Sequence, residues 1–155
     1  MLISRSANKP AVSTSRANRR DTMPEFITSQ YTVLVVDGDA QCRDAVARLL
    51  QRVGYRTRDY DRAGELLDNI DDIVLPACVI CELALPDMTG LDLSRSLHVR
   101  HPQLPVIILT AESNVAAAVT AMRGKVADYL LKPYVERDLV QRLQNALTRF
   151  GAPLN

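Results

Sequence analysis

Acidic, hydroxyl and basic side chains follow four apolar stretches of this sequence, and together they could support chemistry at a carboxylate. These side chains are Asp37, Asp39, Glu82, Thr110 and Lys132. Glu82 ends the run VICE and is followed by Pro86 and Gly90, each four residues after the last. The pattern raises the question of whether Glu82 is a reactive carboxylate or stands where a reactive group has been lost.

The apolar stretches that precede these side chains are predicted to be strands of a parallel sheet. Runs such as VLVV and VIIL are apolar at every position, which indicates strands that are buried on both faces. Apolar residues at helical spacing lie between them, so a β–α unit is repeated five times. Ligands of such sheets bind outside the carboxyl ends of the strands, where these side chains would meet. The predicted strands are 32–36, 55–60, 77–81, 106–109 and 128–131, and the predicted helices are 39–54, 63–70, 90–100, 114–123 and 135–150.

Length and composition are those of one globular domain behind a basic tail. The chain has 155 residues, of which 47% are hydrophobic, enough for a sizeable core. Residues 1–30 carry five basic and two acidic side chains without apolar periodicity, so we predict a disordered tail. We assign residues 31–150 to the domain and 151–155 to a short C-terminal tail. The residues after 30 carry 14 basic and 16 acidic side chains, a balance that argues against DNA binding.

Apolar runs and cysteine usage indicate a cytoplasmic protein. No apolar run is long enough to cross a membrane, and residues 1–30 lack the apolar segment of a secretory signal. Three scattered cysteines are too few for a disulfide framework and fit a reducing compartment.

From residue 32 to residue 150 the sequence resembles a response-regulator receiver domain. The motifs that carry the resemblance are VVDGDA, CELALPDMTG, ILTAES and DYLLKPY. The resemblance implies a flavodoxin-like α/β fold, a doubly wound five-stranded parallel sheet of order 2-1-3-4-5 with helices on both faces. In this family a sensor kinase passes a phosphoryl group to an aspartate at the end of the third strand. A divalent metal and a lysine stabilise the charge of the phosphoryl group.

Several positions match the family pattern residue by residue. Lys132 matches the family lysine, Thr110 matches the switch hydroxyl that turns toward the phosphate, and Asp37 matches the first acid of the metal pair. Tyr129 matches the switch aromatic that then packs inward. The resemblance therefore implies that most residues of the family's phosphorylation switch are present.

Two site positions depart from the pattern, since Gly38 stands where the second metal-binding acid belongs and Glu82 where the phosphorylated aspartate belongs. Magnesium prefers a near-ideal octahedron of oxygen ligands, and Gly38 supplies none from a side chain. Glu82 is longer than aspartate, so its carboxylate sits roughly 1.3 Å further out. Phosphoryl transfer tolerates such a misplacement poorly. We expect no useful phosphorylation, no enzymatic activity and at most weak Mg²⁺ binding, for which the candidate ligands are Asp37, Asp39 and Glu82.

Three interpretations of Glu82 follow from these departures. Glu82 could mimic phospho-aspartate, or it could be inert in a fixed docking module. In the third interpretation the chain still accepts phosphate and uses Asp39 for the metal. We predict an atypical stand-alone receiver that signals through protein contacts without phosphotransfer. The alternatives are a phospho-accepting regulator and the receiver fragment of a longer transcription regulator. A flavodoxin-like cofactor binder would need a phosphate-binding loop after the first strand, and none is present.

The predicted partner surface comprises the fourth helix, the fifth strand and the fifth helix, which form the common dimer or partner face of the family. The run VAAAV at 115–119 gives the fourth helix a small apolar surface. We expect a protein partner there, which could be a kinase, a regulator, an output protein or a second copy of the chain. The candidate interface residues are Val115, Val119, Arg123, Arg137 and Arg142.

Overall fold

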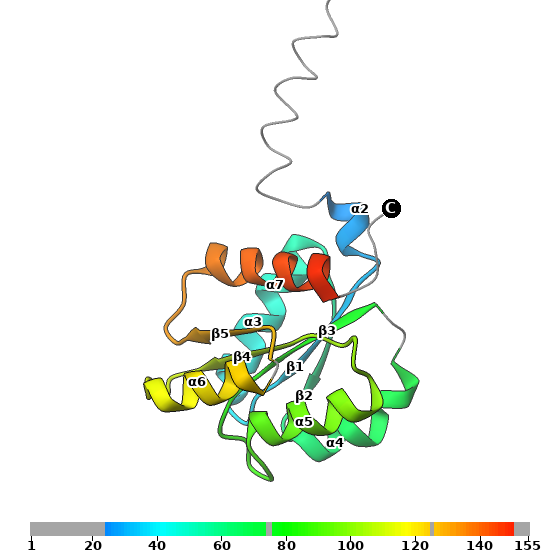
Figure 1. The fold of residues 1–155 in the computed structure, drawn as a ribbon. Coiled ribbons are helices and arrows are strands. Elements are labelled where there is room, and N and C mark those ends of the chain that lie inside the picture. Colours follow the sequence, from blue (N-terminus) through cyan, green and yellow to red (C-terminus); the bar gives the residue numbers. More distant parts are fainter. Residues whose placement is uncertain (1–23, 74–75, 125, 151–155) are drawn as a thin grey trace, which may run out of the picture.

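Five strands form a parallel sheet at the centre of the molecule (Figure 1). The computed structural model describes residues 24–73, 76–124 and 126–150. The strands pair in the order β2-β1-β3-β4-β5, which confirms the predicted flavodoxin-like order. Their bounds are β1 (Thr32–Val36), β2 (Arg56–Tyr60), β3 (Ala77–Cys81), β4 (Val106–Thr110) and β5 (Asp128–Leu131).

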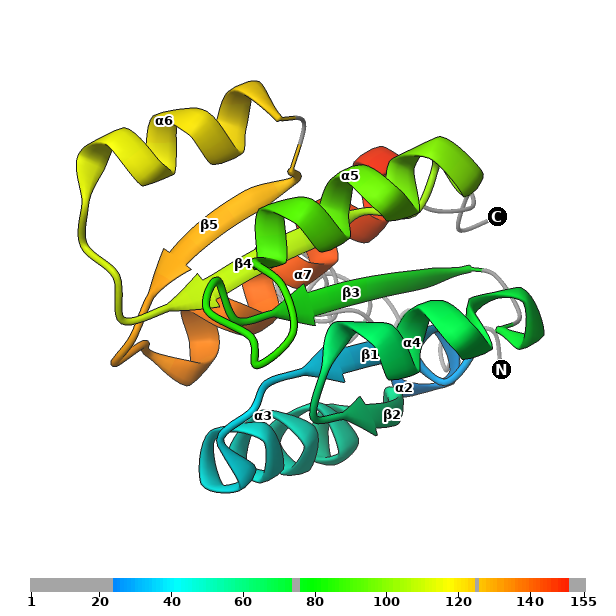
Figure 2. The same cartoon turned by 90° about the horizontal axis from the view of Figure 1, so that it is seen from below.

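Helices cover both faces of this sheet, as Figures 1 and 2 show from two directions. One face carries α3 (Ala40–Val53) and α7 (Glu136–Phe150), and the other carries α4 (Ala63–Asn69), α5 (Gly90–Arg100) and α6 (Val115–Arg123). A 3₁₀ turn (Ile70–Asp72) continues α4, and a short helix α2 (Glu25–Thr28) precedes β1. Within the described ranges, no helix combines the length and the apolar character needed to cross a bilayer.

Single residues determine where two of the helices that border the site begin or end. Gly54 ends α3 with a φ of 108°, a left-handed conformation that glycine adopts without steric cost. Its amide bonds the carbonyls of Leu50 and Gln51. At the start of α6 the Asn114 side chain accepts a hydrogen bond from the Ala116 amide at 2.8 Å and so caps the helix.

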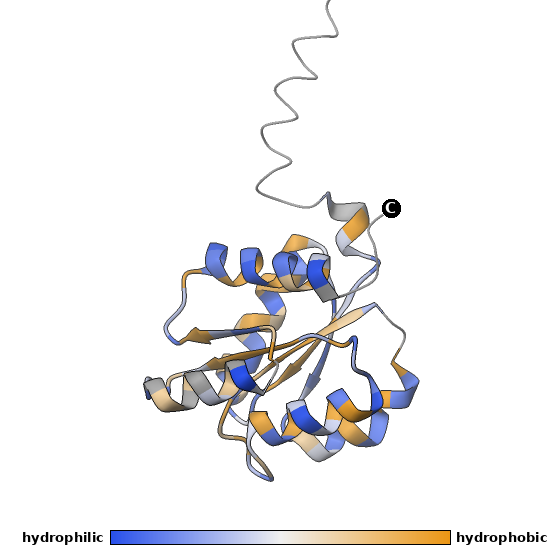
Figure 3. Ribbon diagram, viewed as in Figure 1, coloured by the Kyte–Doolittle hydropathy of each residue, from blue (hydrophilic) through white to orange (hydrophobic). Residues whose placement is uncertain are grey.

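Two apolar layers, one on each side of the sheet, form the core. Leu34 and Val36 pack in the layer toward α4 and α5, whereas Val33 and Val35 pack in the layer toward α3 and α7. All four are at most 2% exposed, which explains why the run is apolar at every position. Figure 3 shows this apolar interior along the strands.

The ordered structure begins earlier than the predicted boundary at residue 31. Instead of disorder, Glu25–Thr28 forms α2, and the Thr28 side chain is fully buried. Its hydroxyl donates a hydrogen bond to the Val53 carbonyl at 3.1 Å, at the end of α3. This bond joins residues 25 positions apart, so no local periodicity reveals it. The remainder of the predicted tail, residues 1–23, and the predicted C-terminal tail, 151–155, lie outside the described residues.

Candidate functional site

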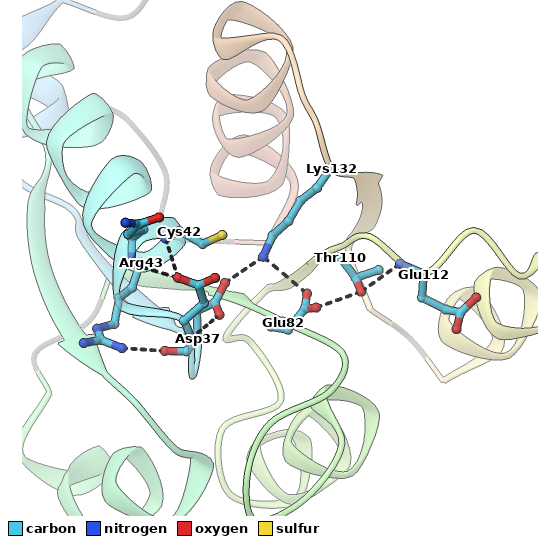
Figure 4. A network of polar contacts seen from close by, with 9 residues as sticks. Asp37, Cys42, Arg43, Glu82, Thr110, Glu112 and Lys132 are labelled. Atoms are coloured by element: carbon cyan, nitrogen blue, oxygen red, sulfur yellow. Dashed lines mark hydrogen bonds and ion pairs between the residues drawn. The ribbon is translucent and has the colours of Figure 1, made fainter.

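Four side chains meet at the carboxyl ends of the strands, as the sequence predicts: Asp37, Glu82, Thr110 and Lys132 (Figure 4). The backbone explains why. Beyond the last residue of β3, the Glu82 amide donates to the Val36 carbonyl at 3.0 Å. The Lys132 amide likewise donates to the Thr110 carbonyl at 2.8 Å. Glu82 and Lys132 thus each continue the parallel ladder by one position, and Thr110 is the last residue of β4, so the side chains align on one edge.

Lys132 lies between two carboxylates. Its Nζ donates a hydrogen bond to Asp37 Oδ2 at 2.8 Å and lies 3.7 Å from Glu82 Oε2. The three side chains are largely buried, with at most 16% of each exposed. Burial by itself lowers the pKa of Lys132, but the hydrogen bond and charge of Asp37, together with the charge of Glu82, raise it overall. The amine is therefore a fixed positive charge at the centre of the site.

Glu82 makes one hydrogen bond to a neighbouring strand. Its Oε1 accepts from the Thr110 hydroxyl at 3.1 Å, whereas its buried Oε2 has no hydrogen-bond donor within the described part of the chain. Burial raises the pKa of Glu82, although the charge of Lys132 and the Thr110 hydroxyl oppose the rise. The carboxylate is thus largely buried and incompletely hydrogen-bonded.

A relay of hydrogen bonds connects Glu82 to Tyr129 on β5. The Thr110 Oγ1 also accepts from the Glu112 amide at 3.2 Å, and the Tyr129 hydroxyl donates to the Glu112 carbonyl at 3.0 Å. The Tyr129 ring packs against the apolar layer that faces α4 and α5. Sequence reasoning did not identify Glu112, because its backbone groups make these contacts and they leave no signature in residue type.

The two residues after Asp37 have other structural roles. Asp39 Oδ1 accepts hydrogen bonds from the amides of Gln41 and Cys42 at 2.9 and 3.3 Å, so it caps α3. These amides lower the pKa of Asp39. A Cβ atom on Gly38 would lie 3.2 Å from Pro86 Cγ. The Pro86 ring therefore occupies part of the space into which a side chain at position 38 would extend.

These residues do not fit a magnesium site. Gly38 offers no ligand, Asp39 is engaged by helix amides, and the Lys132 amine lies at hydrogen-bond distance from Asp37. Among the described residues, no three His, Cys, Asp or Glu side chains form a group that could hold a metal ion. The positive charge near Asp37 and Glu82 is supplied by lysine.

The loop that follows Glu82 packs tightly across the site edge. The Gly90 amide donates to the Leu83 carbonyl at 2.7 Å, and a Cβ on Gly90 would lie 2.6 Å from the Glu82 carbonyl oxygen. Only glycine permits this approach, which accounts for the Glu82-to-Gly90 spacing. Within the loop, Asp87 reaches α4 and bonds two of its backbone amides. Sequence reasoning did not identify this role.

Two residues at the start of α3 complete the edge of the site. Arg43 donates from Nη1 to the Asp37 carbonyl at 2.7 Å. Cys42 lies beside Lys132 in Figure 4, and burial raises the pKa of its thiol. The sequence carries a partial signal for both, since they fall in the first turn of a helix that follows Asp37.

The predicted interface residues divide into three groups. Arg123 and Arg137 are exposed. Arg142 is instead tied to β5, where its Nη1 contacts Asp128 Oδ1 at 2.6 Å. The side chains of Val115 and Val119 lie outside the described residues.

Known proteins share this sequence pattern and fold. The chain is 34% identical over 119 residues to the C4-dicarboxylate transport transcriptional regulatory protein DctD of Pseudomonas aeruginosa, which covers 77% of this chain and 26% of DctD. It is 28% identical over 118 residues to the response regulator protein TmoT of Ectopseudomonas mendocina, covering 76% of this chain and 53% of TmoT. The chain thus spans about a quarter of one relative and about half of the other.

Solved structures and the family model agree with these relatives. A response regulator receiver domain protein from Clostridium thermocellum superposes with a TM-score of 0.72 at 27% identity, covering 77% of this chain and 95% of that one. The receiver domain of NtrX from Brucella abortus superposes with a TM-score of 0.70 at 32% identity. The match covers 74% of this chain and 97% of the NtrX domain. The family model described as response regulator receiver domain matches residues 33–144. With its sheet order and strand-end site, this chain belongs to the response regulator receiver domain family.

Proposed function

We propose that this chain is an atypical receiver whose binding surface is set by Glu82 without phosphotransfer. In this proposal Glu82 occupies the place of the family's phosphorylated aspartate, and the chain is a cytoplasmic protein-binding module, not an enzyme. The observation that carries the proposal is the hydrogen bond from Thr110 to Glu82 Oε1, with Lys132 placed between Glu82 and Asp37.

The hydrogen-bond relay supports a mimic of the phosphorylated state over an inert Glu82. The family switch turns its hydroxyl toward the phosphate and packs its aromatic inward. Here the Thr110 hydroxyl already contacts Glu82, and the Tyr129 ring already contacts the core. A glutamate has one negative charge and two oxygens, whereas a phosphoryl group has roughly 1.5–2 charges and three oxygens, so the mimicry is partial.

The charge balance of the site argues against phosphotransfer. Metal ions neutralise the charge that develops on a transferring phosphoryl group. Gly38 lacks a ligand, and the Lys132 amine already lies beside the two buried carboxylates. We therefore propose that the chain uses no metal cofactor, because the Lys132 amine supplies the positive charge that a metal ion would otherwise supply.

We place the partner surface on α6, β5 and α7, next to the end of the relay. Arg123 and Arg137 are exposed there, and Leu131 is 44% exposed at the end of β5. A mixed apolar and basic surface suits a protein partner or a second copy of this chain. The second candidate is the receiver segment of a longer transcription regulator, which the span of about a quarter of DctD favours.

Intact mass after incubation with a small phosphodonor and Mg²⁺ tests the proposal. We expect wild type to remain unmodified, and the double variant Glu82→Asp with Gly38→Asp to gain one phosphoryl group. Glu82→Asp alone measures the contribution of the acceptor, and Glu82→Gln is the control that lacks any acceptor at this position. A phosphoryl group on wild type that is absent from Glu82→Gln would overturn the proposal and identify a working phospho-acceptor.

A further inference from the structure

Asp87 fastens the loop after Glu82 to the start of α4. Its carboxylate oxygens accept hydrogen bonds from the Ala63 amide at 3.0 Å and the Gly64 amide at 2.8 Å. These amides belong to the first turn of α4 and have no partner within the helix. The residue at the cap position, Arg62, makes no side-chain cap bond in the described structure. The cap of α4 therefore comes from a loop more than 20 residues further along the chain.

Asp87 approaches the backbone of α4 closely because the second residue of this helix, Gly64, has no side chain. A Cβ on Gly64 would lie 3.0 Å from Asp87 Oδ2, at the limit that real contacts reach. The neighbouring residue Pro86 packs on Gly38 in the same way, and Gly90 lies under the Glu82 carbonyl. The loop thus touches two separate segments of the fold, at Gly64 and Gly38, and a third glycine, Gly90, lets its end approach its own start at Glu82.

We propose that Asp87 is a positioning residue that clamps the loop 83–89 to α4 and thereby keeps Glu82 hydrogen-bonded to Thr110. The functional meaning of this clamp rests on the proposed function, because the clamp fixes the geometry by which Glu82 replaces a phosphoryl group. The clamp acts from the far end of the loop, whereas the Glu82 amide is held by Val36 at the near end. Because the loop is held at both ends, no bound metal is needed to orient the Glu82 carboxylate.

The ionisation of Asp87 agrees with this role. Partial desolvation opposes the ionised form, but the amides of Gly64 and Ala63 outweigh it and lower the pKa of Asp87. The charged carboxylate also lies at the positive end of the α4 backbone, which favours it further.

Amide hydrogen exchange of Asp87→Ala, compared with wild type, tests the clamp. We expect exchange at Ala63 and Gly64 to accelerate at least about tenfold, as charge-assisted hydrogen bonds are lost. The decisive reporters are the Gly90 amide, bonded to Leu83, and the Glu112 amide, bonded to Thr110, which should also accelerate. Amides of β1 and β3 should not change.

Asp92→Ala is the matched control, because Asp92 is also an exposed acid near this loop but its side chain pairs with Arg95. It should leave all these amides unchanged. Acceleration confined to Ala63 and Gly64 would overturn the proposal, since Asp87 would then only cap a helix. Uniform acceleration that includes β1 would also overturn it.

Gly64→Ala keeps the carboxylate and gives a second, independent test. Alanine is the better helix former, so a purely local role predicts slower exchange in α4. The clamp instead predicts faster exchange at Gly90 and Glu112, because the new methyl displaces Asp87. Phosphorylation of wild type would overturn the proposed function and leave the clamp intact. Unchanged Glu112 exchange in both variants would overturn the clamp and leave the proposed function intact.

Discussion

Burial of Glu82 beside Lys132 sets the energetics of the site at the scale of single residues. Two carboxylates and one amine share a pocket that water barely reaches. The amine is hydrogen-bonded to Asp37 and lies further from Glu82, so Glu82 is the less compensated acid. Burial raises the pKa of Glu82, and the charge of Lys132 only partly opposes the rise, so the ionised form of Glu82 is a cost to stability.

Replacing Glu82 by Gln should therefore stabilise the protein at neutral pH. The pKa of Glu82 is higher in the folded than in the unfolded state, so folding takes up a proton between these two pKa values. The free energy of unfolding therefore falls as the pH rises from the unfolded-state pKa through the folded-state pKa. We expect Glu82→Gln to raise the free energy of unfolding by up to about 1 kcal/mol. The gain should shrink at about pH 4, where wild-type Glu82 is also protonated. Urea denaturation at both pH values measures the difference.

The exposed Glu65 supplies the control for this experiment, since Glu65→Gln removes an acid of α4 that takes no part in the ion pairs of the site. A loss of stability in Glu82→Gln at neutral pH, with Glu65→Gln unchanged, would show instead that attraction to Lys132 exceeds the cost of burial.

An acid at position 38 should conflict with Pro86. A Cβ there would lie 3.2 and 3.3 Å from Pro86 Cγ and Cδ, so the ring must shift by a few tenths of an ångström. We expect Gly38→Asp to lower the free energy of unfolding by about 1 kcal/mol, at the low end of overpacking costs. Combined with Pro86→Ala, the two losses should be less than additive. Chemical denaturation of the four proteins of this cycle measures the coupling, and full additivity would contradict the conflict.

At the scale of elements, turns and helix starts complete the arrangement of side chains that the strand ends bring together. β3 delivers Glu82 to the sheet edge, but the return of the chain into α5 at Gly90 determines the direction of the loop. Similarly, β1 delivers Asp37, and the cap of α3 removes Asp39 from the group of available acids.

Gly90→Ala should disrupt the return into α5. The added Cβ would lie 2.6 Å from the Glu82 carbonyl oxygen, which is a backbone atom, so no flexible side chain can yield. We expect a loss of about 1–3 kcal/mol in the free energy of unfolding. Thermal and urea denaturation measure it. Gly124→Ala is the control, because its nearest contact, 3.3 Å to the Thr120 carbonyl, would be tight but much less severe than the 2.6 Å contact at Gly90. Equal losses at both glycines would contradict this explanation.

At the scale of the whole molecule, the domain includes α2 and is larger than its motifs indicate. Thr28 is buried and bonded to the end of α3, and Ile27 packs on the layer between the sheet and α3 and α7. This helix covers the end of the domain opposite the site (Figure 1).

Removing α2 should therefore cost stability. We expect the free energy of unfolding of a chain that begins at Tyr31 to be about 1–3 kcal/mol lower than that of one that begins at Met23. The loss comes from the hydrogen bonds of Thr28 and from the exposed apolar area. Urea denaturation of the two chains and of Thr28→Val in the longer chain provides the measurement. Equal stability of both chains would show that α2 is only loosely attached.

From the residues alone we could predict the five strands, their parallel order through the family resemblance, and the arrival of Asp37, Glu82, Thr110 and Lys132 at one edge. These features follow from apolar runs and from the position of each residue relative to its own run, which are local properties. The folded structure was needed to show that Lys132 lies closer to Asp37 than to Glu82, and that Asp87 caps α4. The same holds for Thr28, whose partner is the end of α3. The physical reason is that each of these contacts joins residues more than 20 positions apart, and polar partners at such separation are chosen by how loops and helix ends meet in space.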